Sequence, residues 1–156
     1  MLNKKTKIAY IAYRDALETN LEHISRIISE SEYGVRIYKL GSSDGPLLRQ
    51  NGERVFRSFK KNRSMSERAN KLLFVMAVLK DIRKYRPAIV HIESSCKYFG
   101  IMKLLAPKSK YVYHALSYPM YSKRWQVFKR MLSVYLQCLI MDAVIIQSDA
   151  QRKQWL

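Results

Sequence analysis

The sequence predicts an α/β fold: a doubly wound, Rossmann-like parallel sheet of about six strands with helices on both faces. Two observations lead to this prediction. Short runs rich in β-branched and aromatic residues alternate with longer segments whose apolar residues have helical spacing. Residues 87–119 hold one complete unit, in which a strand ending at Glu93, a short helix and a strand ending near His114 follow one another. Such a unit is nearly always right-handed and parallel.

The composition is that of a globular domain with a strong positive charge. The chain has 156 residues, 48% of them hydrophobic, which is enough for one domain with a buried core. Its 29 Lys and Arg residues against 12 Asp and Glu residues give a net charge of +17. This charge favours nucleic acid, an anionic membrane face or phosphorylated ligands without selecting among them. The 2 cysteines fit a reducing compartment and argue against a disulfide scaffold.

The first half of the chain is expected to hold three strands. Residues 7–13 form a compact apolar run typical of a central parallel strand. A helix follows, with capping-box spacing from Thr19 to Glu22, and a second strand is expected over residues 35–40. A glycine-containing loop over residues 41–52 leads to a third strand over residues 55–59, whose alternating pattern places it near an edge.

The second half is expected to hold three more strands. A capping box from Ser64 to Glu67 begins a helix that ends at Arg86, and the expected buried face is Ala69, Leu72, Met76, Leu79 and Ile82. Then follow a strand over residues 87–93, a helix opening at Ser94, a strand over residues 110–113, a long helix over residues 121–141 and a strand over residues 143–147. The predicted order 3-2-1-4-5-6 places the first and fourth strands at the topological switch point.

Polar residues follow the carboxyl ends of these strands, where ligands of such sheets bind. The candidate cleft-binding residues are Arg14, Asp15, Glu93, Ser94, His114 and Ser148. His114 either contacts a ligand or makes a structural hydrogen bond. Glu93 is either a base or hydroxyl acceptor, or a paired carboxylate. His91, inside a strand, is interpreted as a core histidine with its hydrogen bonds satisfied.

Several kinds of chemistry are missing. The turn over residues 14–18 contains no glycine, which argues against a nicotinamide or flavin enzyme, and there is no Walker loop. The histidines do not have metal-ligand spacing, and no serine lies in a nucleophile elbow. The sequence therefore predicts no metal site and assigns no catalytic residue within this chain.

Basic residues cluster in two stretches that we expect to bind a membrane or another anion. The first runs from Arg54 to Arg86, holds eleven basic residues against only Glu67 and Asp81, and includes Lys60, Lys61 and Arg63. The second contains Lys123, Arg124, Trp125, Lys129 and Arg130. Basic side chains beside exposed aromatics suit a membrane interface, and they also suit single-stranded nucleic acid. The alternative is a solvated helix face with Trp125 and Phe128 in the core. Because no signal peptide or spanning segment is visible, a soluble or peripheral protein is expected.

Three segments carry a family resemblance. Residues 86–91 read RPAIVH, residues 111–114 read YVYH, and residues 141–149 read MDAVIIQSD. In these segments the chain resembles the amino-terminal domain of GT-B fold glycosyltransferases, most closely family 4 (glycosyl transferases group 1). The second segment resembles the strand that ends in a histidine at the interdomain cleft. Two departures are Ala88, where aspartate is common, and Arg14-Asp15-Ala16, where a glycine-containing loop is usual.

The resemblance implies that residues 1–156 are a single Rossmann-like domain, the acceptor-binding half of a retaining glycosyltransferase. It also implies a separate carboxyl-terminal domain for the nucleotide-sugar donor, so this chain needs no cofactor of its own and is expected to be inactive alone. The expected partners are a glycan or lipid-linked acceptor, that missing domain and an anionic membrane, with the protein cytoplasmic and peripheral on the inner membrane face. The alternative is a basic Rossmann-like nucleic-acid-binding module.

Overall fold

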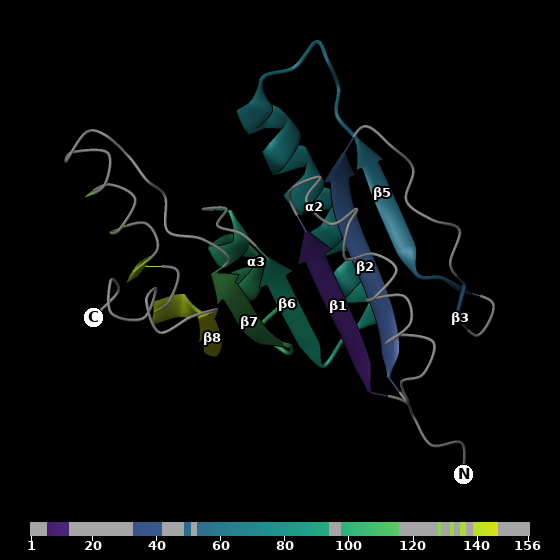
Figure 1. The fold of residues 1–156 in the computed structure, drawn as a ribbon, viewed down its shortest axis with the longest axis vertical. Helices are drawn as coiled ribbons and strands as arrows, with labels where there is room; N and C mark the ends of the chain where they lie inside the picture. Colours follow the sequence, from purple (N-terminus) through teal and green to yellow (C-terminus); the bar gives the residue numbers. More distant parts are fainter. Residues whose placement is uncertain are drawn as a thin grey trace.

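The fold is described by a computed structural model, which covers residues 6–12, 33–41, 49–50, 53–93, 98–115, 128, 132, 135–136 and 139–146. Its main sheet contains β1 (Lys7–Ala12), β2 (Gly34–Gly41), β5 (Phe56–Lys60), β6 (Ile89–Glu93), β7 (Lys110–Ala115) and β8 (Ala143–Ile146). The order is β5-β2-β1-β6-β7-β8, and every neighbouring pair is parallel (Figure 1). The predicted strand order and the Rossmann-like α/β class are confirmed.

Helix α2 (Glu67–Tyr85) connects β5 to β6 and runs behind β1 and β2 in Figure 1. Its N-cap is Ser66, whose hydroxyl oxygen accepts a hydrogen bond from the Ala69 amide at 3.2 Å. The predicted cap at Ser64 is wrong, because the Ser64 hydroxyl instead donates to the Asn62 side chain at 2.7 Å. The predicted end is confirmed at Arg86, which has a φ of 52°.

One face of the sheet packs against α2 and the shorter helix α3 (Phe99–Leu105). The buried core on this face contains Ala9, Ile11, Tyr38, Leu40, Val90, Ile92, Tyr111 and Tyr113 from the strands, with Phe74, Val75, Val78, Leu79, Ile82 and Met102 from the helices. The predicted face of α2 is wrong at Leu72 and Met76, which are exposed. Residues 72–79 are apolar throughout, so more than one helical stripe fits the pattern and the sheet selects one.

An ionic cluster joins α2 to the sheet. Asp81 accepts hydrogen bonds from Arg36 at 3.2 Å and from the Tyr38 hydroxyl at 2.6 Å, and Arg57 lies 3.2 Å from its other oxygen. Arg36 is only 7% exposed, and its guanidinium lies 3.9 Å from the ring centroid of Tyr85. These residues come from β2, from β5 and from the C-terminal part of α2. The cluster therefore fixes the rotation of the helix on the sheet.

Three further expectations are affected by the structure. Strands β3 (Arg49–Gln50) and β4 (Glu53–Arg54) form a separate antiparallel pair, within and just after the stretch predicted as a loop. Helix α3 begins at Phe99, later than the predicted opening at Ser94, which lies outside the described residues. The helix predicted over residues 19–28, which belongs to the expectation of helices on both faces, also lies outside them.

The predicted helix over residues 121–141 is described at only some of its positions. These are helical and exposed: Phe128, Leu132, Tyr135, Leu136, Leu139 and Ile140. Phe128 is 56% exposed, so the alternative that places it in the core is wrong, whereas Trp125 lies outside the described residues. Within the part of the chain that the structure describes, no helix has the length and apolar character needed to cross a bilayer.

Candidate functional site

The switch point of the sheet lies between β1 and β6, since the chain leaves β1 toward β2 and leaves β6 toward β7. At the carboxyl ends of these strands, Ala12 is the register partner of Glu93, and Glu93 is the register partner of His114. Two of the predicted site residues, Glu93 and His114, therefore stand side by side on neighbouring strands. Both are half-buried.

A polar cluster forms around these two residues, and we define it as Tyr10, His91, Glu93 and His114. The Tyr10 hydroxyl donates a hydrogen bond to the Glu93 carboxylate. The rings of Tyr10 and His91 lie 4.8 Å apart, and the rings of His91 and His114 meet edge to face at 5.5 Å. These side chains lie on the face of the sheet opposite α2, because they alternate with the core residues of β1, β6 and β7.

Burial sets the protonation of two members of the cluster. It raises the pKa of Tyr10 well above the usual value of a phenol, and the hydrogen bond to Glu93 acts in the same direction. Burial, together with the nearby His114, lowers the pKa of His91 to about 4. At neutral pH the phenol of Tyr10 is therefore protonated and the imidazole of His91 is neutral.

His91 corrects one expectation. Its Nε2 atom is buried and has no hydrogen-bond partner in the described part of the chain, so the interpretation as a satisfied core histidine is wrong. A buried polar atom without a partner costs about 1–3 kcal/mol, and such atoms in native proteins call for a physical reason. A ligand hydroxyl or phosphate oxygen at the cluster would supply a partner.

Residues that sequence reasoning missed belong to the same region. Tyr10 lies two residues before the end of β1. Side chains alternate between the two faces of a strand, but this alternation does not tell which face is covered by the helices. Lys39 is the register partner of Ala12 and is only 1% exposed. Lys39, Ala12, Glu93 and His114 thus form one row across the sheet. A lysine on the same side of the alternating strand as Val35 and Ile37 was the available signal.

The other predicted site residues are divided between described and undescribed parts of the chain. Lys60, Lys61 and Arg63 are exposed and follow the carboxyl end of β5. The remaining predicted residues lie outside the described ranges: Arg14, Asp15, Ser94, Lys123, Arg124, Trp125, Lys129, Arg130 and Ser148. In the parts of the chain with described coordinates, His, Cys, Asp and Glu side chains do not form a group of three able to hold a metal ion.

The arrangement suits binding of a polar, hydroxyl-rich or anionic ligand. Glu93 accepts hydrogen bonds, the imidazoles of His91 and His114 each offer a donor and an acceptor when neutral, and the cluster lies where parallel sheets bind ligands. Comparison with known proteins adds no assignment: the chain matches no protein-family model, no curated protein and no solved structure.

Proposed function

We propose that residues 1–156 form the acceptor-binding domain of a retaining glycosyltransferase that moves a sugar from a nucleotide-sugar donor to a glycan or lipid-linked acceptor. The observation that supports this most is the polar cluster at the switch point, with Glu93 and His114 in register and the buried Nε2 of His91 without a partner among the described residues. A sugar hydroxyl can both donate to and accept from such groups, whereas an ionised phosphate oxygen can only accept, from an imidazole N–H.

The proposal includes a second domain and a membrane. The nucleotide-sugar would be held by a carboxyl-terminal domain closing over the carboxyl edge of the sheet, so residues 1–156 alone would bind acceptor without turnover. The net charge of +17 supports a peripheral position on the anionic cytoplasmic membrane face, where Lys60, Lys61 and Arg63 are candidate contacts. This position would bring the cluster close to a lipid-linked acceptor.

His114→Ala tests the proposal. In the complete gene product, sugar transfer should fall about tenfold or more, equivalent to about 1.4 kcal/mol in the transition state, because a contact to the acceptor is lost. Lys110→Ala is the matched control, since Lys110 lies on the same strand at its other end and is exposed. Transfer is measured with radiolabelled nucleotide-sugars, and folding is measured by thermal melting.

A ligand-binding role and a structural role of His114 predict opposite effects on activity and on melting temperature. A ligand contact loses activity while the melting temperature stays within a few degrees of wild type. A structural histidine loses melting temperature while activity per folded molecule is retained, and that result would contradict the proposal. Transfer catalysed by residues 1–156 alone would contradict the need for a second domain.

A further inference from the structure

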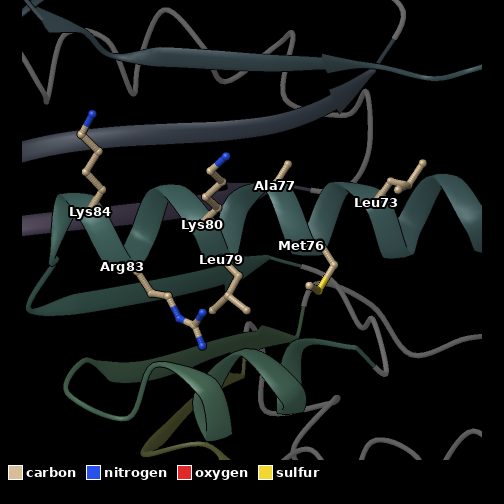
Figure 2. Close-up of a pocket in the computed structure, with 7 residues that line it drawn as sticks. All are labelled: Leu73, Met76, Ala77, Leu79, Lys80, Arg83 and Lys84. Atoms are coloured by element: carbon tan, nitrogen blue, oxygen red, sulfur yellow. The ribbon is translucent and has the colours of Figure 1, made fainter.

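The outer face of α2 carries an open groove that is separate from the polar cluster of Tyr10, His91, Glu93 and His114. The groove is lined by Leu73, Met76, Ala77, Leu79, Lys80, Arg83 and Lys84 and has a volume of about 830 Å³ (Figure 2). Leu73 is 52% exposed and Met76 is 49% exposed, although both are large apolar side chains. Lys80 and Lys84 are one helical turn apart and leave the helix on the same side in Figure 2.

Helix α3 extends the exposed apolar surface. Its Leu104 is 73% exposed, and Ile101 and Leu105 are exposed as well. Arg83 connects the two helices, because its guanidinium donates to the Leu105 carbonyl oxygen at 3.2 and 3.3 Å. We define the α2–α3 face as the outward side of these helices. Its apolar members are Leu73, Met76, Ile101, Leu104 and Leu105, and its basic members are Lys80, Arg83 and Lys84.

The α2–α3 face is positively charged, and neither of the two acidic residues of α2 lies on it. Within α2 the acidic residues are Glu67 and Asp81, and α3 has none. Asp81 is directed to the sheet, where it binds Arg36 and Tyr38, and Glu67 lies in the first turn, where it pairs with Lys71 at 2.7 Å. None of the ion pairs found among the described residues includes Lys80, Arg83 or Lys84, so their charge is available to an external partner.

We propose that the α2–α3 face docks onto an anionic lipid bilayer. Exposed Leu, Ile and Met side chains can enter the boundary between headgroups and acyl chains, while Lys80 and Lys84 contact anionic headgroups. Single-stranded nucleic acid is disfavoured as the partner, because bases stack on aromatic side chains and the groove is lined by aliphatic ones. Its basic residues belong to the basic stretch of residues 54–86, but the surface does not include Lys60, Lys61 or Arg63, and it does not depend on sugar transfer.

The first test compares two charge-reversal pairs of equal total charge. Lys80→Glu with Lys84→Glu changes the α2–α3 face, and Lys108→Glu with Lys110→Glu changes exposed lysines just before and at the start of β7. Binding is measured by co-sedimentation with vesicles of phosphatidylglycerol and phosphatidylcholine. Each well-placed basic residue contributes about 1 kcal/mol, about fivefold, so the first pair should weaken binding by about tenfold or more. The control pair should change it by less than about threefold.

A second variant tests the apolar contribution. Leu73→Ser with Leu104→Ser should remove most of the binding that survives at high salt, because insertion of apolar side chains is not screened as charge is. Both side chains are exposed, so the melting temperature should be unchanged. Equal losses from the two lysine pairs, equal binding to vesicles of phosphatidylcholine alone, or displacement from vesicles by a single-stranded oligonucleotide would each overturn the proposal.

Vesicle binding by the α2–α3 face can be tested separately from the proposed sugar transfer. His114→Ala should leave vesicle binding unchanged, because His114 lies near the carboxyl end of β7, on the face of the sheet opposite α2 and α3. Vesicle binding that depends on Lys80 and Lys84 would support the docking surface even if no sugar transfer were found. Loss of vesicle binding in His114→Ala, in a variant that melts like wild type, would contradict the placement on α2 and α3.

Discussion

His91 has an unusual environment for a histidine. The Tyr10 ring lies beside it from β1 and the His114 ring from β7, and its Nε2 is buried without a partner among the described residues. Its pKa falls from 6.5 to about 4 in the folded protein, chiefly because burial disfavours the charged ring. Between these two pH values the unfolded chain binds more protons than the folded chain does. The stability contributed by neutral His91 is therefore complete above about pH 6.5 and is lost as the pH falls toward 4.

The prediction for His91 concerns the slope of stability with pH. Between pH 6.5 and pH 4.5, wild type should lose free energy of unfolding more steeply than His91→Phe, by at most about 1.4 kcal/mol per pH unit. Phenylalanine keeps a ring beside Tyr10 and removes the titrating nitrogen. The measurement is urea denaturation at several pH values, with the difference between the two proteins as the readout. Parallel curves, or an NMR titration of His91 with a midpoint near 6.5, would contradict the prediction.

At the scale of residues, sequence reasoning located part of the cluster. Glu93 and His114 end adjacent strands, and the strand order alone places their backbones side by side. Tyr10 and Lys39 were not predicted as site residues, because alternation within a strand does not say which face is covered by α2. That the Nε2 of His91 has no partner among the described residues could not be predicted either, since hydrogen-bond satisfaction depends on packing among side chains from different strands.

At the scale of elements, the rotation of α2 depends on one acidic residue. Residues 72–79 are apolar throughout, so the hydrophobic pattern alone does not define the buried face. Asp81 resolves this ambiguity, because its carboxylate reaches Arg36 and Tyr38 on β2 only when Phe74 and Val78 face the sheet. The sequence showed Asp81 as a rare acid in a basic stretch, but not its partners, which lie more than forty residues away in the chain.

Asp81→Ala should therefore be strongly destabilising. It removes the carboxylate beside the nearly buried Arg36 and the hydrogen bond of the Tyr38 hydroxyl, and removing one partner of a buried ion pair costs about 3–5 kcal/mol. Glu67→Ala is the matched control, because it breaks the exposed pair with Lys71 on the same helix and should cost less than about 1 kcal/mol. Both free energies are measured by urea denaturation. Equal effects of the two substitutions would show that the cluster does not hold α2.

At the scale of the whole molecule, the chain order of strands and helices was sufficient to predict the sheet. Each of the six strands was expected within a few residues of its observed position, and the doubly wound order follows from right-handed connections. The antiparallel pair of β3 and β4 was missed, because strands of two residues are too short to show a periodic pattern. The exposed apolar side of α2 and α3 was also missed, since a buried and an exposed leucine look alike in a sequence.

The net charge of +17 has opposite consequences for folding and for binding. Repulsion among like charges destabilises the compact state, and salt weakens that repulsion. The Debye length falls from about 10 Å at 0.1 M to about 3 Å at 1 M ionic strength, so most charges on the surface then no longer interact. Sodium chloride should therefore raise the melting temperature of the protein while it weakens attachment to anionic vesicles.

The last prediction measures both effects on one preparation. Between low salt and about 0.5 M sodium chloride, the melting temperature should rise by a few degrees and vesicle binding should fall by about tenfold or more. Chloride is used because sulfate also strengthens the burial of apolar surface. The Lys80→Glu, Lys84→Glu variant should melt at a higher temperature than wild type in low salt, because its net charge is smaller. A melting temperature that falls with sodium chloride would show that attractive ion pairs such as Arg36–Asp81 outweigh the repulsion.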